Sequence, residues 1–260
     1  MFFPFHDDNP TERTPVVTFG IIAVNVAIFL WATQLTPIQR RELDLTRGFV
    51  PARVRQFVEP KPIPVPFASP TRDAFGRITP ARTLLLPPNR REIVISLFTC
   101  MFLHAGLWHL AGNMWFLWLF GNNVEDRLGG ILFIVLYLGG GLIATGCHWL
   151  TDPVGTTPVI GASGAVAAVL GAYFITWPWA RVHTLVFLFF FFTVVNVPAI
   201  VVLGVWFLGQ LLAGHEALQA GEPHGVAWWA HVGGFLAGLV LMPLFAALAG
   251  DSKRPRRADS

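Results

Sequence analysis

The sequence has little charge for its length. Of its 260 residues, 13% are charged and 54% are hydrophobic, whereas soluble domains average about 25% charged and about 45–50% apolar residues. The mean hydropathy is accordingly positive, at +0.58. Because no single water-soluble core needs so much apolar surface, the composition excludes most soluble enzymes and indicates a protein whose solvent is lipid.

Cysteine is also scarce. Cys100 and Cys147 both lie in apolar stretches, are too few for a disulfide framework, and form no Cys-x-x-Cys metal motif. We expect both thiols to be buried for packing, and we expect no cofactor and no bound metal. The net charge of +3 comes largely from one loop and the C-terminal tail, a distribution that argues against nucleic-acid binding.

Long apolar runs, in contrast, are abundant, and a membrane helix needs roughly 20 predominantly apolar residues. The residues before the first run have no basic segment and no small-residue cleavage site, so we expect a retained span rather than a signal peptide. The runs that predict spans are, in chain order, 16–35, 107–120, 131–150, 161–177, a part of 182–214, and 226–248.

The predicted organisation is a short N-terminal tail (1–15), one membrane domain (16–250) and a basic C-terminal tail (251–260). Within the domain, residues 36–92 form a long Pro-rich loop without a span, with 11 of the 18 lysines and arginines and short amphipathic pieces around 50–57. Loop and tail both favour the cytoplasm, yet six spans place them on opposite sides. We give the tail slightly more weight.

The run 182–214 is ambiguous. A helix over its 33 residues would be about 50 Å long, too long for one untilted crossing of a hydrocarbon core of about 30 Å. Pro198 lies in its middle and can break or kink a helix. The run therefore holds either two short spans or one interfacial segment and one span.

Polar side chains inside membrane spans are costly and mark function by default. Ser163 begins one span, where backbone N–H groups without helical partners can bind a developing anion. His231 begins the last span. Stripes of small residues on the two helices would let them pack closely, so that a neutral His231 could take the proton of Ser163. The alternative for each residue is a role in packing alone.

His109 and Asn113 lie four residues apart and therefore on one helical face. They can donate hydrogen bonds to an oxyanion, or they can simply bond to a neighbouring helix. No carboxylate lies within a span, so a Ser–His unit here would be a dyad. The tautomer of its histidine would then be set by packing or by other hydrogen bonds.

Together these motifs resemble the rhomboid family of intramembrane serine proteases. The matches occur in the family's order and spacing over nearly the whole chain: Phe102-Leu103-His104, His109-Leu110, Asn113-Met114, Glu125-Asp126-Arg127-Leu128-Gly129, Gly161-Ala162-Ser163-Gly164 and Ala230-His231-Val232-Gly233-Gly234. Any one of them is weak evidence, but the set is highly specific.

The resemblance implies an all-α membrane protein with six transmembrane helices and an active site below the outer membrane surface. It implies that Ser163 is the nucleophile, that His231 is the general base, and that His109 and Asn113 bind the oxyanion. His104 matches a histidine near the cavity mouth that structures the first loop or retains water. Glu125 and Arg127 match a structural pair at the cytoplasmic end of the second span.

The same resemblance implies substrates that are single-pass membrane proteins, entering sideways between the second and fifth spans. Such substrates tend to have a small residue before the cut and helix-weakening residues after it. Membrane lipids are the other expected partner. The absence of an organelle-type presequence favours a bacterial plasma membrane.

The fold that the resemblance implies also resolves the long run, because in it Ser163 and His231 share one membrane face. Since each residue begins a span, the segment between span four and span six must cross the membrane once. We place that crossing at about 197–212 and expect 182–195 to be partly interfacial or tilted.

Two departures from the family pattern affect the site. Residues 93–96 read Ile-Val-Ile-Ser, without the Trp-Arg pair that often precedes the His104 motif. Position 167, where some members stack an aromatic ring on the catalytic histidine, is an alanine. The imidazole of His231 therefore needs another support.

Two other functions fit parts of the pattern. A non-catalytic rhomboid relative that binds and escorts membrane clients would share the fold, although it need not keep both Ser163 and His231. A metalloprotease or metal transporter could use His104, His109 and His231. The sequence lacks a His-Glu-x-x-His motif and an intramembrane carboxylate to complete such a site.

Overall fold

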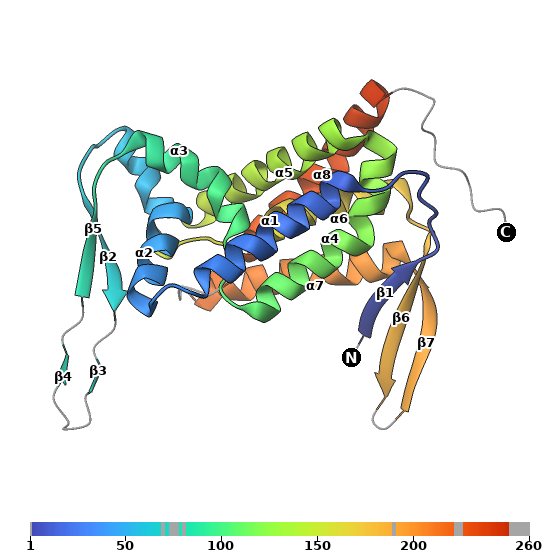
Figure 1. Cartoon of the computed structure of the whole chain (residues 1–260), viewed down its shortest axis with the longest axis horizontal. Helices are drawn as coiled ribbons and strands as arrows, with labels where there is room; N and C mark the ends of the chain where they lie inside the picture. Colours follow the sequence, from blue (N-terminus) through green and yellow to red (C-terminus); the bar gives the residue numbers. More distant parts are fainter. Residues whose placement is uncertain are drawn as a thin grey trace.

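The protein is an apolar helical bundle with smaller elements at its two ends (Figure 1). The computed structural model describes residues 2–68, 71–72, 78–79, 82–188, 191–220 and 226–249, so the basic tail 251–260 lies outside the described residues. A helix occupies each of the predicted spans: α1 Val16–Ala32, α4 Leu107–Leu128, α5 Gly130–Thr151, α6 Ser163–Thr176, α7 Ala199–Ala220 and α8 Trp228–Ala249.

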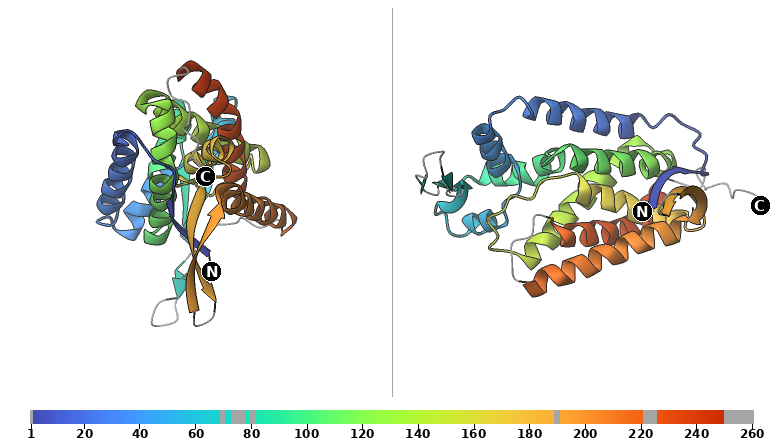
Figure 2. Two further views of the ribbon diagram at one scale, coloured as in Figure 1. Left: turned by 90° about the vertical axis from the view of Figure 1, so that its right-hand side faces the viewer. Right: turned by 90° about the horizontal axis from the view of Figure 1, so that it is seen from below.

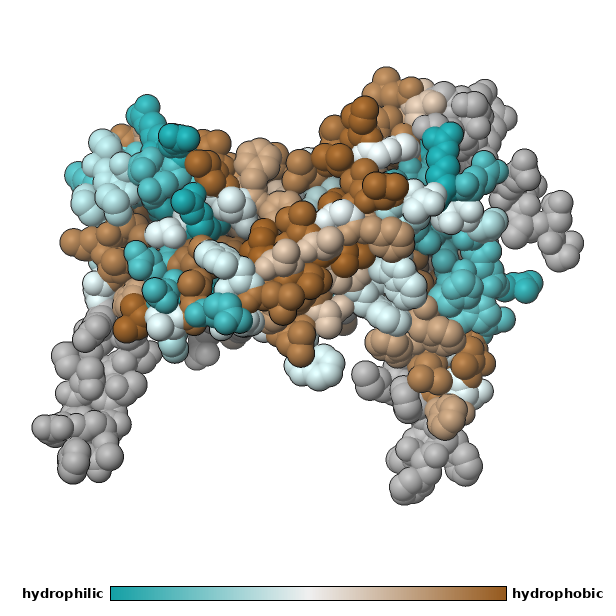
Figure 3. Space-filling model, viewed as in Figure 1, coloured by the Kyte–Doolittle hydropathy of each residue, from teal (hydrophilic) through white to brown (hydrophobic). Residues whose placement is uncertain are grey.

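The helices differ in their capacity to cross a membrane. Within the described residues, α5, α7 and α8 are long and apolar enough to span it alone. The segment Arg90–Phe102 and α4 qualify together, although they are bent by 80° against one another. α1 and α6 are apolar but shorter. Figure 3 shows apolar side chains over the bundle between two more polar ends, the surface of an integral membrane protein.

The short helix α6 lies at the centre of the bundle. All residues from Ala165 to Tyr173 are buried, and α6 packs most extensively against α8 and then α5. Its 14 residues make a helix of about 21 Å, shorter than a hydrocarbon core of about 30 Å. α6 alone is therefore too short to cross such a core from one surface to the other.

The predicted stripes of small residues do bring α6 and α8 together. A Cβ atom added at Gly171 would lie 2.0 Å from the carbonyl oxygen of Phe235, and one at Gly238 would lie 1.9 Å from that of Ala168. The two backbones approach so closely that only glycine fits at these crossings. This contact fixes the starts of α6 and α8 relative to each other.

The described residues of the predicted loop 36–92 form a cap of helices and strands at one end of the bundle (Figure 2). The cap contains no helix that could span a membrane among its described residues. Its elements are α2 Pro37–Arg47, the 3-10 helix η1 Pro51–Phe57, the antiparallel pairs β2 Ile63–Ala68 with β5 Arg82–Leu86 and β3 Thr71–Arg72 with β4 Ile78–Thr79, and the start of α3 Arg90–Thr99, which leads into η2 Cys100–Phe102.

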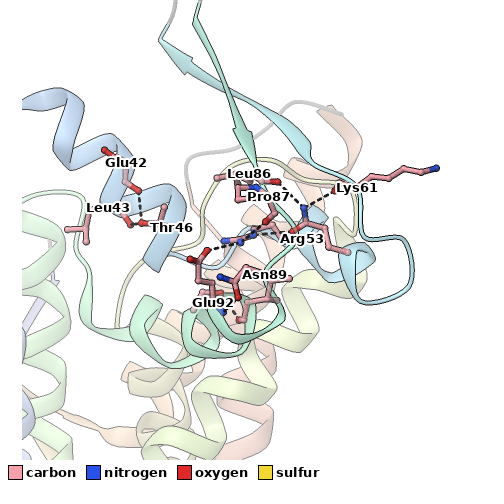
Figure 4. Close-up of polar contacts among 12 residues, drawn as sticks. Glu42, Leu43, Thr46, Arg53, Lys61, Leu86, Pro87, Asn89 and Glu92 are labelled. Carbon is pink, nitrogen blue, oxygen red and sulfur yellow. Dashed lines mark hydrogen bonds and ion pairs between the residues drawn. The ribbon is translucent and has the colours of Figure 1, made fainter.

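A buried arginine holds this cap together (Figure 4). The side chain of Arg53 is 1% exposed, and its guanidinium lies 3.2 Å from Glu92 Oε2 and 3.3 Å from Gln56 Oε1. Gln56 in turn donates to the carbonyl oxygen of Leu86 at 3.0 Å. These bonds tie the 3-10 helix to β5 and to α3.

Residues 182–195 were expected to be partly interfacial or tilted, and their described residues are strands rather than a tilted helix; their interfacial position stays a prediction. β6 Arg181–Leu188 and β7 Phe191–Pro198 form an antiparallel hairpin, and β1 Phe2–Asp7 adds to β6 to give the order β1-β6-β7. β-Branched and aromatic residues favour strands, and an apolar run alone cannot tell a strand from a helix. Pro198 is the last residue of β7, and α7, which begins at Ala199, is the one helix among the described residues of this run.

The thiols were expected to be buried. Both are free among the described residues, and Cys100 is buried, but Cys147 is only half-buried.

Candidate active site

Ser163 and His231 meet at the starts of the two helices that pack most closely. Ser163 is the first residue of α6, and His231 lies in the first turn of α8. The Nε2 atom of His231 is 2.8 Å from Ser163 Oγ. This distance is a hydrogen bond between a hydroxyl and a base, and both side chains reach a cavity of about 520 Å³.

Gln210 on α7 is a member of the site that sequence reasoning missed. Its Oε1 atom lies 2.6 Å from His231 Nδ1. An amide oxygen can only accept a hydrogen bond, so Nδ1 carries the proton and Nε2 is free to accept from Ser163. Gln210 is the one non-glycine polar residue between positions 199 and 214. A single polar side chain in such an apolar segment could have marked it as a candidate site residue.

Two tryptophans flank the imidazole of His231. The ring of Trp206 on α7 is centred 6.1 Å from the imidazole, and Trp228 meets it edge-on at 6.0 Å. Ala167 occupies the position from which some rhomboid-like sequences stack an aromatic ring on the histidine. It is fully buried and faces Gly234 of α8. The support for the histidine therefore comes from α7 and the start of α8 rather than from α6.

His109 lies against the turn that precedes Ser163. Gly161 has a φ of +130°, and a Cβ there would lie 2.8 Å from His109 Nε2 and 3.6 Å from Ser163 Oγ. Asn113, one turn further along α4, donates from Nδ2 to the carbonyl oxygen of His109 at 2.8 Å. Both residues line the cavity with Ser163.

His104 is buried beside His109, with the two ring centroids 5.2 Å apart, and its expected place near the cavity mouth stays a prediction. The residue is 1% exposed and is not among the residues that line the cavity. Its Nε2 atom accepts from the backbone N–H of Ala162 at 3.4 Å, and Arg40 donates to its carbonyl oxygen. His104 therefore links the cap to the turn that carries Ser163.

Glu125 binds backbone N–H groups at the start of α1, at the end of the bundle opposite Ser163. Its carboxylate accepts from the backbone N–H groups of Val17 at 2.9 Å and Thr18 at 2.7 Å, which are at the beginning of α1. A carboxylate at a helix N-terminus is stabilising. The hydrogen bonds found for Glu125 thus join α4 to α1, far from Ser163.

We expect Gln210→Leu to slow the reaction of Ser163 with a fluorophosphonate, because the substitution keeps the bulk of the side chain but removes the acceptor that orients His231. The loss should be smaller than the roughly 10⁴-fold drop in kcat seen when the carboxylate of a soluble triad is replaced. Gln210→Glu, which keeps an acceptor oxygen, should react faster than the leucine variant. Equal labelling rates for the leucine variant and the parent protein would contradict a positioning role.

The fold and the site together are those of a helical integral membrane protein that encloses a serine–histidine pair. The family model described as Rhomboid domain matches residues 91–248, more than half of the chain. The chain belongs to the rhomboid family.

Two similar proteins agree with this assignment. Rhomboid protein 1, mitochondrial, of Saccharomyces cerevisiae is 33% identical over 182 residues, which are 67% of this chain and 48% of that protein. The presenilin-associated rhomboid-like protein, mitochondrial, of Bos taurus is 31% identical over 172 residues, 64% of this chain and 43% of that protein. The chain thus matches less than half the length of these relatives. Since both are named as mitochondrial, they do not support the expectation of a bacterial plasma membrane.

Proposed function

We propose that the protein is an intramembrane serine endopeptidase that cleaves transmembrane-helix substrates with Ser163 and His231. Membership of the rhomboid family supports intramembrane proteolysis in general. The observation that carries the dyad is the 2.8 Å contact between His231 Nε2 and Ser163 Oγ. The 2.6 Å contact of Nδ1 with Gln210 supports the tautomer that this mechanism needs.

The chemistry follows from this tautomer. Ser163 Oγ attacks the scissile carbonyl carbon while its proton moves to His231 Nε2. The tetrahedral intermediate collapses, the leaving amine takes the proton from His231, and an acyl-enzyme on Ser163 remains. A water molecule then gives a proton to His231 Nε2 and attacks the ester carbon. The bond from that carbon to Ser163 Oγ breaks, Oγ takes the proton back from His231, and the second product leaves as a carboxylic acid.

The negative charge of the intermediate requires donors beside Ser163. Backbone N–H groups of the first turn of α6 lack helical partners by geometry, and no side chain caps that turn. The His109 imidazole lies next to the same turn. Asn113 can contribute when its amide turns from the carbonyl oxygen of His109 toward the cavity.

We expect Asn113→Ala to lower kcat by about 10²–10³-fold with little change in KM, as the loss of one oxyanion donor does in soluble proteases. The measurement is steady-state cleavage of a single-pass substrate in detergent micelles. Asn122→Ala, at the far end of α4, is the matched control and should have the parent rate. An equal loss of kcat in both variants would mean that the substitutions disturb α4 rather than remove a hydrogen bond to the oxyanion.

Access between α4 and α7 fits the shape of the cavity. Residues of both helices line it, Phe116 and Asn113 from α4 and Trp206 and Gln210 from α7. Direct contact between these two helices is sparse in the part of the chain that the structure describes. We propose that a single-pass substrate enters by parting α4 and α7, with a small residue before the cut and helix-weakening residues after it.

The geometry does not favour the two other functions considered. Both ring nitrogens of His231 are engaged, one by Ser163 and one by Gln210, so a metal there would have to break the pair. A client-binding protein would not need a nucleophile with an oriented base. Residence in a bacterial plasma membrane stays a prediction from the sequence alone, to be tested by fractionation of the native cells.

Labelling with a fluorophosphonate tests the proposal without knowledge of the substrate. The probe should modify the parent protein on Ser163, as located by mass spectrometry of the labelled peptide, and should leave Ser163→Ala unmodified. His231→Ala should label far more slowly because the serine loses its base. Absence of labelling in a parent protein that melts cooperatively would favour the client-binding function.

A further inference from the structure

Three metal-ligating side chains gather at the end of the bundle opposite Ser163. His6 of β1, Asp8 just after β1, and His183 of β6 each offer one ligand atom, and these atoms all lie within 4.8 Å of one another. His183 Nε2 is 2.6 Å from Asp8 Oδ1. The cluster shares no residue with the candidate active site, and its sheet projects from one end of the bundle in Figure 1.

Strand pairing brings these side chains to one face. His6 and His183 are direct cross-strand partners in the antiparallel register of β1 and β6. Asp8 is two residues beyond His6, the spacing that returns a side chain to the same face of a strand, and its backbone N–H donates to the carbonyl oxygen of Arg181 at 3.0 Å. The intervening Asp7 points the other way and accepts from the Tyr173 hydroxyl inside the bundle.

The backbone around the cluster is held independently of any ion. Besides the bond from Tyr173 to Asp7, the indole N–H of Trp115 donates to the carbonyl oxygen of Pro4 at 2.8 Å. Asn123 donates to the carbonyl oxygen of Asn9 at 3.0 Å. Two helices of the bundle, α4 and α6, thus fix β1 before and after His6, so the ligands are positioned in advance.

We propose that His6, Asp8 and His183 form a binding site for Zn²⁺. Two imidazole nitrogens and one carboxylate oxygen are a ligand set that zinc accepts in tetrahedral geometry, with a fourth position left for water. Softer, thiol-dependent ions and the oxygen-preferring Mg²⁺ and Ca²⁺ fit this set less well. Ion binding replaces the hydrogen bond between His183 and Asp8, and small side-chain rotations bring all three atoms to one centre.

The site is open to solvent, which bears on its role. The side chains of His183 and Asp8 are 26% and 42% exposed, and His6 is exposed as well. An ion can therefore reach the site without unfolding. Because its ligands come from positions 6, 8 and 183, a bound ion would fasten the N-terminal strand to the hairpin. This role is independent of peptide-bond hydrolysis.

The test is zinc titration of the full chain, purified without a polyhistidine tag, stripped with chelator and held in detergent micelles. Competition with a chromogenic zinc indicator should give one zinc per chain for the parent protein. His6→Ala, Asp8→Asn and His183→Ala should each lower the affinity for zinc by at least about 10–100-fold. Losing a group that only hydrogen-bonds to a metal ligand already lowers metal affinity by that much. Mg²⁺ should not compete.

Matched controls separate this cluster from other histidines. His215→Ala removes an exposed histidine of α7, and His231→Ala removes the candidate base, so both should bind zinc as the parent does. Saturating zinc should also slow amide hydrogen exchange in β1 and β6 of the parent protein but not of His183→Ala. Zinc binding that survives His183→Ala and Asp8→Asn together, or that is lost equally in His215→Ala, would overturn the assignment.

Discussion

Replacing His231 with alanine should lower kcat by about 10⁶-fold, the scale on which a soluble serine protease responds to loss of its general base. The reason is local. Ser163 Oγ has a hydrogen-bond partner in His231 Nε2 at 2.8 Å, and without it the hydroxyl keeps its proton and is a weak nucleophile. KM should change little, because His231 acts on the proton and not on the bulk of the substrate.

The control for this prediction is another histidine of the same chain. His215 lies near the end of α7, where its ring contacts the side chain of Gln219, and His215→Ala should leave kcat unchanged. The measurement is initial rates on a fluorogenic single-pass substrate in liposomes, with each variant shown to melt cooperatively. A His231→Ala protein within tenfold of the parent rate would refute the role of His231 as the base.

The sequence predicted the helices of the bundle well because a membrane helix is a local feature. Each needs about 20 apolar residues in a row, and α5 and α8 show this pattern without reference to the rest of the chain. Hydropathy did not predict the structure of 182–195, because an apolar run of this kind fits a strand as well as a helix. There β6 pairs with β7, its neighbour in the chain, and with β1, 175 or more positions away, and hydropathy records neither pairing.

The site was predictable to the extent that its residues carry motifs. Ser163 and His231 were predicted because each polar residue stands in a glycine-rich helix start. Gln210 was missed because a lone amide in an apolar helix is usually a packing residue, and its contact with His231 depends on how α7 packs beside α8. The hydrogen bond of His104 with the N–H of Ala162 could not be predicted from the sequence, because it depends on how the cap packs on the bundle.

The scarcity of charge also bears on the mechanism. Among the described residues, the carboxylates with assigned bonds lie at the ends of the bundle or in the cap, such as Glu125 at the start of α1 and Glu92 beside Arg53. A neutral amide, Gln210, contacts the base instead. A neutral partner fits a lipid-surrounded site, where a buried charge without a close partner is expensive.

Ser163→Ala should abolish cleavage, with a loss of about 10⁶-fold in kcat, because the alanine has no atom that can form the acyl bond. The substitution removes one oxygen from a half-buried position, so the fold should persist. The double variant Ser163→Ala/His231→Ala should be no slower than either single variant, since the two groups act as one unit. A further loss in the double variant would show that they act independently.

The most direct measurement is cleavage of a single-pass substrate by the purified parent protein and by Ser163→Ala, each reconstituted in liposomes, with product termini identified by mass spectrometry. The account predicts that the parent cuts in or beside the transmembrane helix of the substrate and that Ser163→Ala, folded and able to bind substrate, gives no product. The same product from Ser163→Ala at the parent rate would contradict it.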